Sequence, residues 1–290
     1  MDNRHQSLYG VLLILLSGIL LASHDGLSKY LTQLYPVFLV VWARYLAQVV
    51  LMLGMFAPRM GRRVFHTLRP WPQLLRGLSL VSVSIMFISG LRYIPLAEAT
   101  AVIFLTPLMV TVASALLGER VSHSQWLAVG VGLLGVMIIV RPGGALFTPA
   151  VLLPFGAAIS FTVYQLLTRR LSGTDHPVTS NFLSSLVGFL VMSVLVTFNW
   201  RTPSVHDAVL MASLGLMAMS GHLVLTQAFR YASAASLAPF TYGQIVFAGI
   251  VGFIAFGHIP DVEAIAGMTV IIASGLCMAY VQTRQASRSA

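Results

Sequence analysis

Long apolar runs, separated by short segments that contain Pro, Gly or charged residues, occupy nearly the whole chain. A helix needs about 20 apolar residues to cross the hydrocarbon core of a bilayer. These runs lack the polar alternation of membrane β-strands, which excludes a transmembrane β-barrel. We therefore predict an all-α integral membrane protein. Ten transmembrane helices are expected near residues 8–28, 36–56, 73–91, 97–117, 126–140, 151–168, 177–198, 208–228, 234–256 and 264–281.

The composition supports this class, because the hydrophobic residues are too many for one protein core. Of 290 residues, 57% are hydrophobic and 9% are charged, whereas about 25% are charged in a soluble domain. The formal net charge of +9 would suggest nucleic acid as a partner of a soluble protein. Here the basic residues flank the apolar runs one or two at a time. We therefore expect contact with the lipid bilayer and no nucleic-acid binding.

The basic residues also predict how the chain is oriented. An even number of spans places both termini on one side, and cytoplasmic loops carry the excess of Lys and Arg. Twelve arginines fall on the side of the termini, and Arg44 lies inside the second span. The other side receives only Lys29, Arg92, Arg141 and Arg201. Both termini are therefore predicted to be cytoplasmic.

The second half of the chain repeats the first. Arg92, Tyr93 and Ala97 recur as Arg230, Tyr231 and Ala235, and Gly118 recurs as Gly257, at shifts of 138 and 139 residues. We therefore divide the chain into a five-helix repeat over residues 1–145 and a second over residues 146–290. Because five is odd, the second repeat is inverted in the membrane. Inverted repeats around a central cavity are typical of alternating-access transporters; the alternative is a non-transporting membrane scaffold.

Motifs for ATP hydrolysis or common membrane-enzyme chemistry are missing from the sequence. Lys29 is the only lysine and is followed by Tyr30, so the chain has no P-loop. The histidines lack the spacing of a metalloprotease helix, no Gly-x-Ser-x-Gly elbow occurs, and Cys277 is the only cysteine. We expect no catalytic residue, no cofactor and no metal site. Transport would then be secondary, with an intramembrane enzyme as the alternative.

Ionisable side chains inside spans are costly, about 2.5–3.5 kcal/mol each at the membrane centre, and indicate pairing or function. Asp25 is predicted either to pair with Lys29 one helical turn away or to face the mouth of a cavity. Arg44 and Glu98 lie at similar depth, so they either form an ion pair or bind substrate or protons. His222, in the middle of the eighth span, either hydrogen-bonds a neighbouring helix or lines the cavity.

Hydroxyl, aromatic and amide residues cluster in four spans, mostly at helical spacing, and are our candidates for the cavity wall. They are Ser79, Ser82 and Met86 in the third span, Thr100 and Phe104 in the fourth, Ser160 and Tyr164 in the sixth, and Thr241, Tyr242 and Gln244 in the ninth. The alternative role of the small hydroxyl residues is helix packing. Such a cavity would have no strong fixed charge and would suit a small amphiphilic metabolite, for example an amino acid.

Three short motifs mark the fourth span: the run from Pro95 to Thr100, which reads Pro-Leu-Ala-Glu-Ala-Thr, then Pro107, and Leu-Leu-Gly-Glu at residues 116–119. With the repeat length and the number of spans, they resemble the drug/metabolite transporter superfamily, and more narrowly its EamA-type exporters. The resemblance covers essentially the whole chain. The second half departs from it, because Phe256, Gly257 and His258 stand where the family often has a Gly-Glu ending.

The resemblance implies a carrier of the bacterial inner membrane that exports aromatic and other neutral amino acids from the cytoplasm by alternating access. It also implies that helices one, three, four, six, eight and nine line the cavity. The stretch from Asp25 to Lys29 and the Pro95–Thr100 run also resemble relatives that import metabolites such as S-adenosylmethionine or riboflavin, so import is the alternative. We expect a monomer rather than a dimer. Proton coupling would make Asp25, Glu98 or His222 titrate during the cycle.

Overall fold

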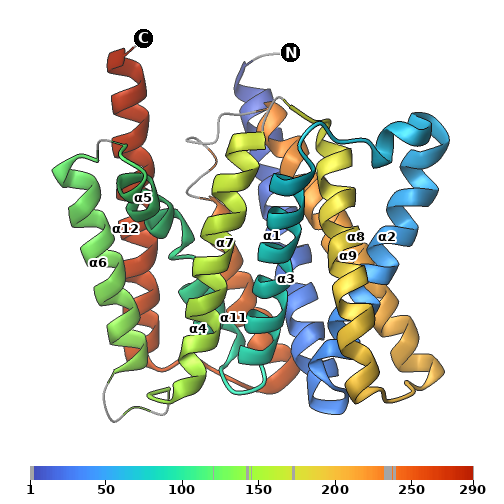
Figure 1. Ribbon diagram of the computed structural model, residues 1–290. Coiled ribbons are helices and arrows are strands. Elements are labelled where there is room, and N and C mark those ends of the chain that lie inside the picture. Colours follow the sequence, from blue (N-terminus) through green and yellow to red (C-terminus); the bar gives the residue numbers. More distant parts are fainter. Residues whose placement is uncertain are drawn as a thin grey trace.

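The computed structural model describes residues 3–119, 121–141, 144, 146–171, 174–231, 237 and 240–289. This part of the chain forms a bundle of helices joined by short connections (Figure 1). In chain order the helices are α1 (Asn3–Leu34), α2 (Val37–Met60), α3 (Pro70–Gly90), α4 (Leu96–Ile103), α5 (Thr106–Leu116), α6 (His123–Val140), α7 (Leu152–Leu171), α8 (Pro177–Leu195), α9 (Val205–Tyr231), α11 (Gly243–Phe256) and α12 (Val262–Ser289). Short 3₁₀ turns are η1 (Gly61–Phe65), η2 (Pro149–Val151) and η3 (Val196–Asn199).

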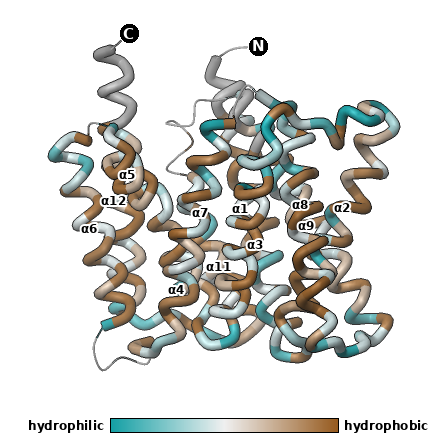
Figure 2. The backbone as a smooth tube through the Cα atoms, viewed as in Figure 1, coloured by the Kyte–Doolittle hydropathy of each residue, from teal (hydrophilic) through white to brown (hydrophobic). Residues whose placement is uncertain are grey.

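Nine helical segments of the described residues are long and apolar enough to cross a membrane. Apolar residues dominate the middle of the bundle, while hydrophilic residues gather toward its two ends (Figure 2). The predicted span 234–256 lies partly outside the described residues, and its described remainder includes α11, with 14 residues. The prediction of an all-α membrane protein is therefore confirmed, and ten spans are roughly consistent with it.

Two helix boundaries differ from prediction in ways that matter for the site. The first helix was expected to end at residue 28, but α1 continues to Leu34, since the first helix-breaking residue after it is Pro36. The third was expected to begin at residue 73, but α3 begins at Pro70, because proline is well accommodated in the first turn of a helix. The first shift places Lys29 inside a helix, and the second moves Arg76, which the predicted span already contained, from its first turn to the second turn of α3.

The span predicted over residues 97–117 is confirmed as Leu96–Leu116, but a break that the sequence did not predict divides it into α4 and α5. Pro107 is the second residue of α5; it lacks an amide proton and its ring clashes with a continuous helix. In the second half, Tyr242 directly precedes α11, 138 residues after Phe104 at the first break. The two rings contact each other, with centroids 5.3 Å apart. The equivalent breaks of the two repeats therefore meet.

The helices pack in a pattern that is the same in both halves. α1 packs on α9 as α7 packs on α3, and α2 packs on α9 as α8 packs on α3. Other main contacts join equivalent helices, namely α2 with α8, α4 with α11 and α6 with α12. Exchanging the halves leaves this pattern unchanged, as expected for two inverted repeats. The start of α1 and the end of α12 lie at the same end of the bundle, here named the terminal end; the opposite end is the distal end (Figure 1).

Candidate substrate cavity

Two adjoining hollows lie between the repeats. The central lobe, of about 480 Å³, is lined from α1, α2, α3, α7, α9 and the α4–α5 break. The terminal lobe, of about 380 Å³, is lined from α2, α3, α7, α8 and α9 and continues to Asp175 between α7 and α8. The lobes share the lining residues Arg44, Leu80, Phe161, His222 and Leu225. Together they form a cavity that extends toward the terminal end.

Arg44 is a fixed cation in the wall of both lobes. It projects from α2, is 8% exposed, and donates from Nη1 to the Ser84 hydroxyl of α3 at 3.0 Å. Its guanidinium carbon lies 5.2 Å from the centroid of the Tyr45 ring. Within the described part of the chain, its Nε has no hydrogen-bond partner. The cavity therefore carries a strong fixed charge, contrary to our interpretation of the sequence.

His24 and Asp25 lie next to each other on α1 in the wall of the central lobe. His24 Nδ1 and Asp25 Oδ1 are 2.9 Å apart. The other ring nitrogen of His24, Nε2, is buried and has no hydrogen-bond partner among the described residues. The Asp25 carboxylate thus faces the cavity and contacts a histidine, so the predicted pairing with Lys29 is wrong.

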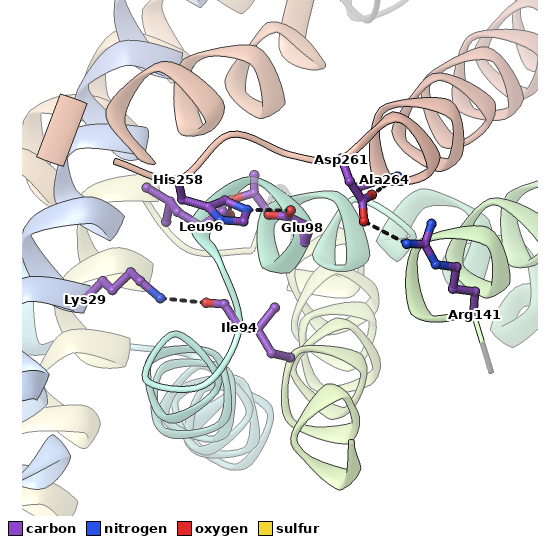
Figure 3. Close-up of polar contacts among 9 residues, drawn as sticks. Lys29, Ile94, Leu96, Glu98, Arg141, His258, Asp261 and Ala264 are labelled. Carbon is purple, nitrogen blue, oxygen red and sulfur yellow. Dashed lines mark hydrogen bonds and ion pairs between the residues drawn. The ribbon is translucent and has the colours of Figure 1, made fainter. Parts of the chain in front are cut away.

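Lys29 is buried at the distal end, although the sequence predicted a loop position. Its ammonium donates hydrogen bonds to the backbone carbonyls of Leu91 and Ile94, with 2.7 Å to Ile94 (Figure 3). Both carbonyls belong to the connection that follows α3, where the backbone no longer has intrahelical partners. Because these two acceptors hold the ammonium, Asp25 remains available to the cavity.

Arg76 is a cavity residue that the sequence reasoning missed, because it was counted among the loop arginines. It lies in the second turn of α3 and is 3% exposed. Its N–H groups all have acceptors at 2.6–3.3 Å, which are Thr168 Oγ1, the Ser180 carbonyl, Ser184 Oγ, the Tyr164 hydroxyl and Asn181 Oδ1. Arg76 therefore joins α3 to α7 and α8. Pro70 and Pro72 were the signal that the helix begins before residue 73 and that Arg76 lies a full turn inside it.

About half of the predicted site residues lie in the cavity wall. They are Asp25, Arg44, Phe104, Tyr164, His222, Thr241 and Gln244. The ring of Tyr164 stacks on that of Phe161 at 5.6 Å, which adds a second aromatic side chain to the same wall. Thus charged, polar and aromatic groups from both repeats come together.

The predicted face of α3 differs from the face that lines the cavity. The lining face contains Leu80, Val83, Ser84 and Phe87. Ser79 is bonded to the carbonyl of Leu75 in its own helix, and Ser82 is exposed on the outer surface of the bundle. Met86 packs against Ser160 of α7, with 3.9 Å between sulfur and hydroxyl. Both faces satisfy the spacing of a helix, so hydroxyl content alone did not distinguish them.

Thr100 and Tyr242 lie in helix contacts outside the lining. Thr100 is fully buried and donates to the carbonyl of Leu96 in the preceding turn at 2.7 Å. Tyr242 is 5% exposed, packed behind Phe104. A Cβ atom at Gly275 of α12 would fall 1.5 Å from the Tyr242 hydroxyl, so this ring needs a glycine opposite it.

Glu98 lies at the distal end, where it pairs with His258 and not with Arg44. Glu98 Oε1 and His258 Nε2 are 2.9 Å apart (Figure 3). The predicted Arg44–Glu98 pair is wrong, because α4 packs on α7 and α11, whereas α2 packs on α8 and α9. Equal depth in the membrane did not make them neighbours.

A further contact between the repeats lies close to this pair (Figure 3). Arg141, at the end of α6, bonds Asp261 at 3.0 Å and Glu263 at 2.8 Å before and within the first turn of α12. With the Glu98–His258 pair, these contacts tie the first repeat to the second at the distal end. The cavity is thus bounded there by contacts between the repeats, while its other lobe extends toward the terminal end.

Comparison with known proteins identifies the family. A solved structure covering 97% of this chain and 99% of its own shares the fold, with a TM-score of 0.64 at 21% identity. Curated relatives include the S-adenosylmethionine uptake transporter of Rickettsia prowazekii (27% identity, 97% of this chain, 95% of the relative). Others are the riboflavin transporter of Vibrio cholerae (26%, 99% and 98%) and the pseudopaline exporter CntI of Pseudomonas aeruginosa (26%, 95% and 97%). A model of the EamA-like transporter family matches residues 8–141 and 148–280. The chain is a multi-pass membrane transporter that belongs to the EamA-like transporter family.

Proposed function

We propose that this protein carries an amphiphilic metabolite with an amino-acid group through the central cavity. The observation that carries the proposal is the difference between the two buried arginines. Arg76 has acceptors for all its N–H groups, whereas Arg44, in the wall of both lobes, donates to Ser84 and has an Nε without a partner among the described residues. A buried cation with unfilled donors is strongly stabilised by a carboxylate, which accepts two hydrogen bonds from a guanidinium.

The central lobe offers a complementary group for each part of such a solute. The carboxylate would contact Arg44, and the ammonium would contact Asp25 in the wall of the same lobe. Phe87 and Phe104 supply apolar surface for the rest of the molecule. A lobe of about 480 Å³ is in the range of pockets for drug-sized ligands. This volume favours an amino-acid conjugate such as S-adenosylmethionine over a free amino acid. The uptake transporters among the relatives support import as the direction of transport.

Export of free aromatic and other neutral amino acids is the second candidate. The observation in its favour is the aromatic wall formed by Phe104, Phe161 and Tyr164, which suits a single ring beside the Arg44 guanidinium. The exporter of pseudopaline among the relatives supports this direction. The two candidates share the carboxylate site and differ in solute size and direction.

Transport would follow from the symmetry of the repeats. The cavity extends toward the terminal end and is bounded by inter-repeat contacts at the distal end, so exchanging the conformations of the two halves would reverse its access. With both termini cytoplasmic, this structure would be the inward-facing state in the bacterial inner membrane. We propose that the transporting unit is a monomer.

The test is flux into proteoliposomes with radiolabelled S-adenosylmethionine, riboflavin and phenylalanine measured side by side. We expect S-adenosylmethionine to be carried. The Arg44→Gln variant should raise the KM for this solute by about 10- to 100-fold, because it loses one or two hydrogen bonds from a charged donor, each worth on the order of 1 kcal/mol. Ser82→Ala, on the outer surface of α3, is the matched control and should leave flux unchanged. Movement of riboflavin alone, or an unaltered KM in Arg44→Gln, would refute the proposed site.

Direction needs intact cells, because reconstituted carriers insert in both orientations. Expression should rescue growth of cells that depend on external S-adenosylmethionine if the protein imports it. Resistance to a toxic phenylalanine analogue, without such rescue, would instead favour the second candidate.

A further inference from the structure

The Glu98 carboxylate at the distal end is only half satisfied. Glu98 is 2% exposed, in the first turn of α4. Its Oε1 contacts His258 Nε2 at 2.9 Å, while its Oε2 is buried and has no hydrogen-bond partner among the described residues. A buried carboxylate with an empty acceptor is an expensive arrangement for a purely structural residue. This arrangement points to a carboxylate that changes its hydrogen-bond partner, or gains and loses a proton, during the transport cycle.

His258 gives this buried carboxylate a route to water. Its side chain is 37% exposed, whereas that of Glu98 is 3% exposed. The left-handed Gly257, at φ 67°, ends α11 and turns the chain so that His258 contacts α4. An imidazole can take a proton from water at one nitrogen and hold another at the second, which makes it an effective proton relay.

Few charged groups face Glu98 from the elements that pack around it. From α1, the Lys29 ammonium attracts it and also lies 5.6 Å over the Phe256 ring. Arg92, in the α3–α4 connection, is exposed, and the facing residues of η2 and the start of α7 contain no ionisable side chain. Near α6 and α12, Arg141 is paired with Asp261 and Glu263. The start of α4 also favours a negative charge.

We propose that Glu98 is the proton-binding carboxylate of a proton-coupled transport cycle, and that His258 relays its proton from the distal side. The proton passes from Nε2 of the imidazolium to Oε1 of Glu98, so an N–H bond breaks, an O–H bond forms and no electrons are transferred. Once neutral, Glu98 no longer holds a charged His258 of the second repeat by ion pairing, and within the first repeat it no longer attracts Lys29. The distal end then parts, and the proton crosses with the solute. This inference rests on the proposed transport function and adds the coupling ion to it.

The flux test uses the full chain in proteoliposomes with radiolabelled S-adenosylmethionine and an inward proton gradient of about one pH unit, which is worth about tenfold in accumulation for one coupled proton. Wild-type protein should accumulate the label toward tenfold. The Glu98→Gln variant should bring the label only to equal concentrations inside and outside the vesicles, while still exchanging external for internal label. Glu119→Gln, at the equivalent turn of the terminal end, is the matched control and should accumulate like wild type. Full accumulation by Glu98→Gln would overturn the proposal.

A second measurement does not depend on the solute. Infrared difference spectra of the purified protein, recorded as pH is lowered, should show a protonated-carboxyl band that is lost in Glu98→Gln and moves to another pH in His258→Ala. A spectrum unchanged by Glu98→Gln would overturn the proton site even if transport is observed. If the wild type carries no S-adenosylmethionine but the band titrates as expected, the proposed substrate fails and the proton site stands.

Discussion

The distal and terminal ends of the bundle share a turn but differ in the residue that follows it. Gly118 ends α5 and Gly257 ends α11, with φ of 89° and 67°, a conformation that glycine adopts without steric cost. At the terminal end the next residue is Glu119, which pairs with Arg169; these side chains are 46% and 64% exposed. At the distal end the next residue is His258, whose partner Glu98 is 3% exposed.

This difference shows how two repeats with the same helix arrangement come to have different contacts at the two ends of the bundle. An exposed ion pair is screened by water and salt and contributes little to stability. A buried pair must stay together, because separating it leaves a desolvated charge in the protein interior. One changed residue after an equivalent glycine therefore gives the distal end a contact with a buried carboxylate where the terminal end has an exposed ion pair, while the hydrogen bonds of Arg76 join the repeats in the terminal lobe.

The largest effect is expected from Lys29→Met at the distal end. This change removes both hydrogen bonds to the carbonyls of Leu91 and Ile94 and leaves two acceptors buried. At about 1–3 kcal/mol for each of the two unsatisfied groups, the loss should be roughly 2–6 kcal/mol. Thermal unfolding of the detergent-solubilised protein measures it. Arg169→Met, the control at the terminal end, should melt like wild type; equal destabilisation by both changes would remove the contrast between the ends.

A smaller effect is expected from His258→Ala, which removes the partner of the buried Glu98 carboxylate. We expect about 1–3 kcal/mol of destabilisation and easier opening of the distal end. In a Cys277→Ser background, a cysteine replacing Phe104 in the central lobe should react faster with a membrane-impermeant maleimide added from the distal side. An unchanged labelling rate would show that the contact with His258 does not hold this end closed.

Acid should loosen one contact of the terminal end. Burial opposes ionisation of Asp175, but hydrogen bonds from Thr67, Gln73 and the backbone N–H of Leu68 outweigh it and lower the pKa of the carboxyl group. A lowered folded-state pKa means that this stabilisation is complete above the unfolded pKa of about 3.9 and is lost as pH falls through the folded value. Melting temperatures of wild type and Asp175→Asn should therefore begin to converge below about pH 4 and should meet once the pH lies under the lowered folded pKa. A difference that persists there would contradict this account.

The smallest effect is expected from Glu119→Gln. Hydrogen bonds from Ser114 and then from Arg169 lower the pKa of Glu119, yet the carboxylate lies at the water-exposed surface, with 46% of its side chain exposed. Water therefore replaces these contacts when they are lost. Melting temperatures in low and high salt should match those of wild type within error. A salt-dependent loss of stability would mean that the terminal end is held more firmly than the exposure of this pair implies.

Some features of the site could be predicted only as alternatives. The sequence placed His222, Tyr164 and Gln244 among the candidate wall residues because polar side chains in spans need a reason to be there. It also placed Arg44 and Glu98 at one depth, but depth does not specify which helices are neighbours. The roles of Lys29 and Arg76 were missed because each lies within a few residues of a predicted helix end, where the error of a boundary decides whether a cation is in a loop or in the interior.

The sequence by itself determined what depends on length and order along the chain: an all-helical membrane protein, built from two halves with an odd number of spans each. The bilayer requires long apolar helices, and the repeat is visible as recurring residues. Only the tertiary structure decided which helix faces converge, why the Nε of Arg44 lacks a partner among the described residues while all N–H groups of Arg76 have acceptors, and that Glu98 meets His258. These outcomes depend on helix packing across the two halves, and several faces of one helix satisfy the same spacing.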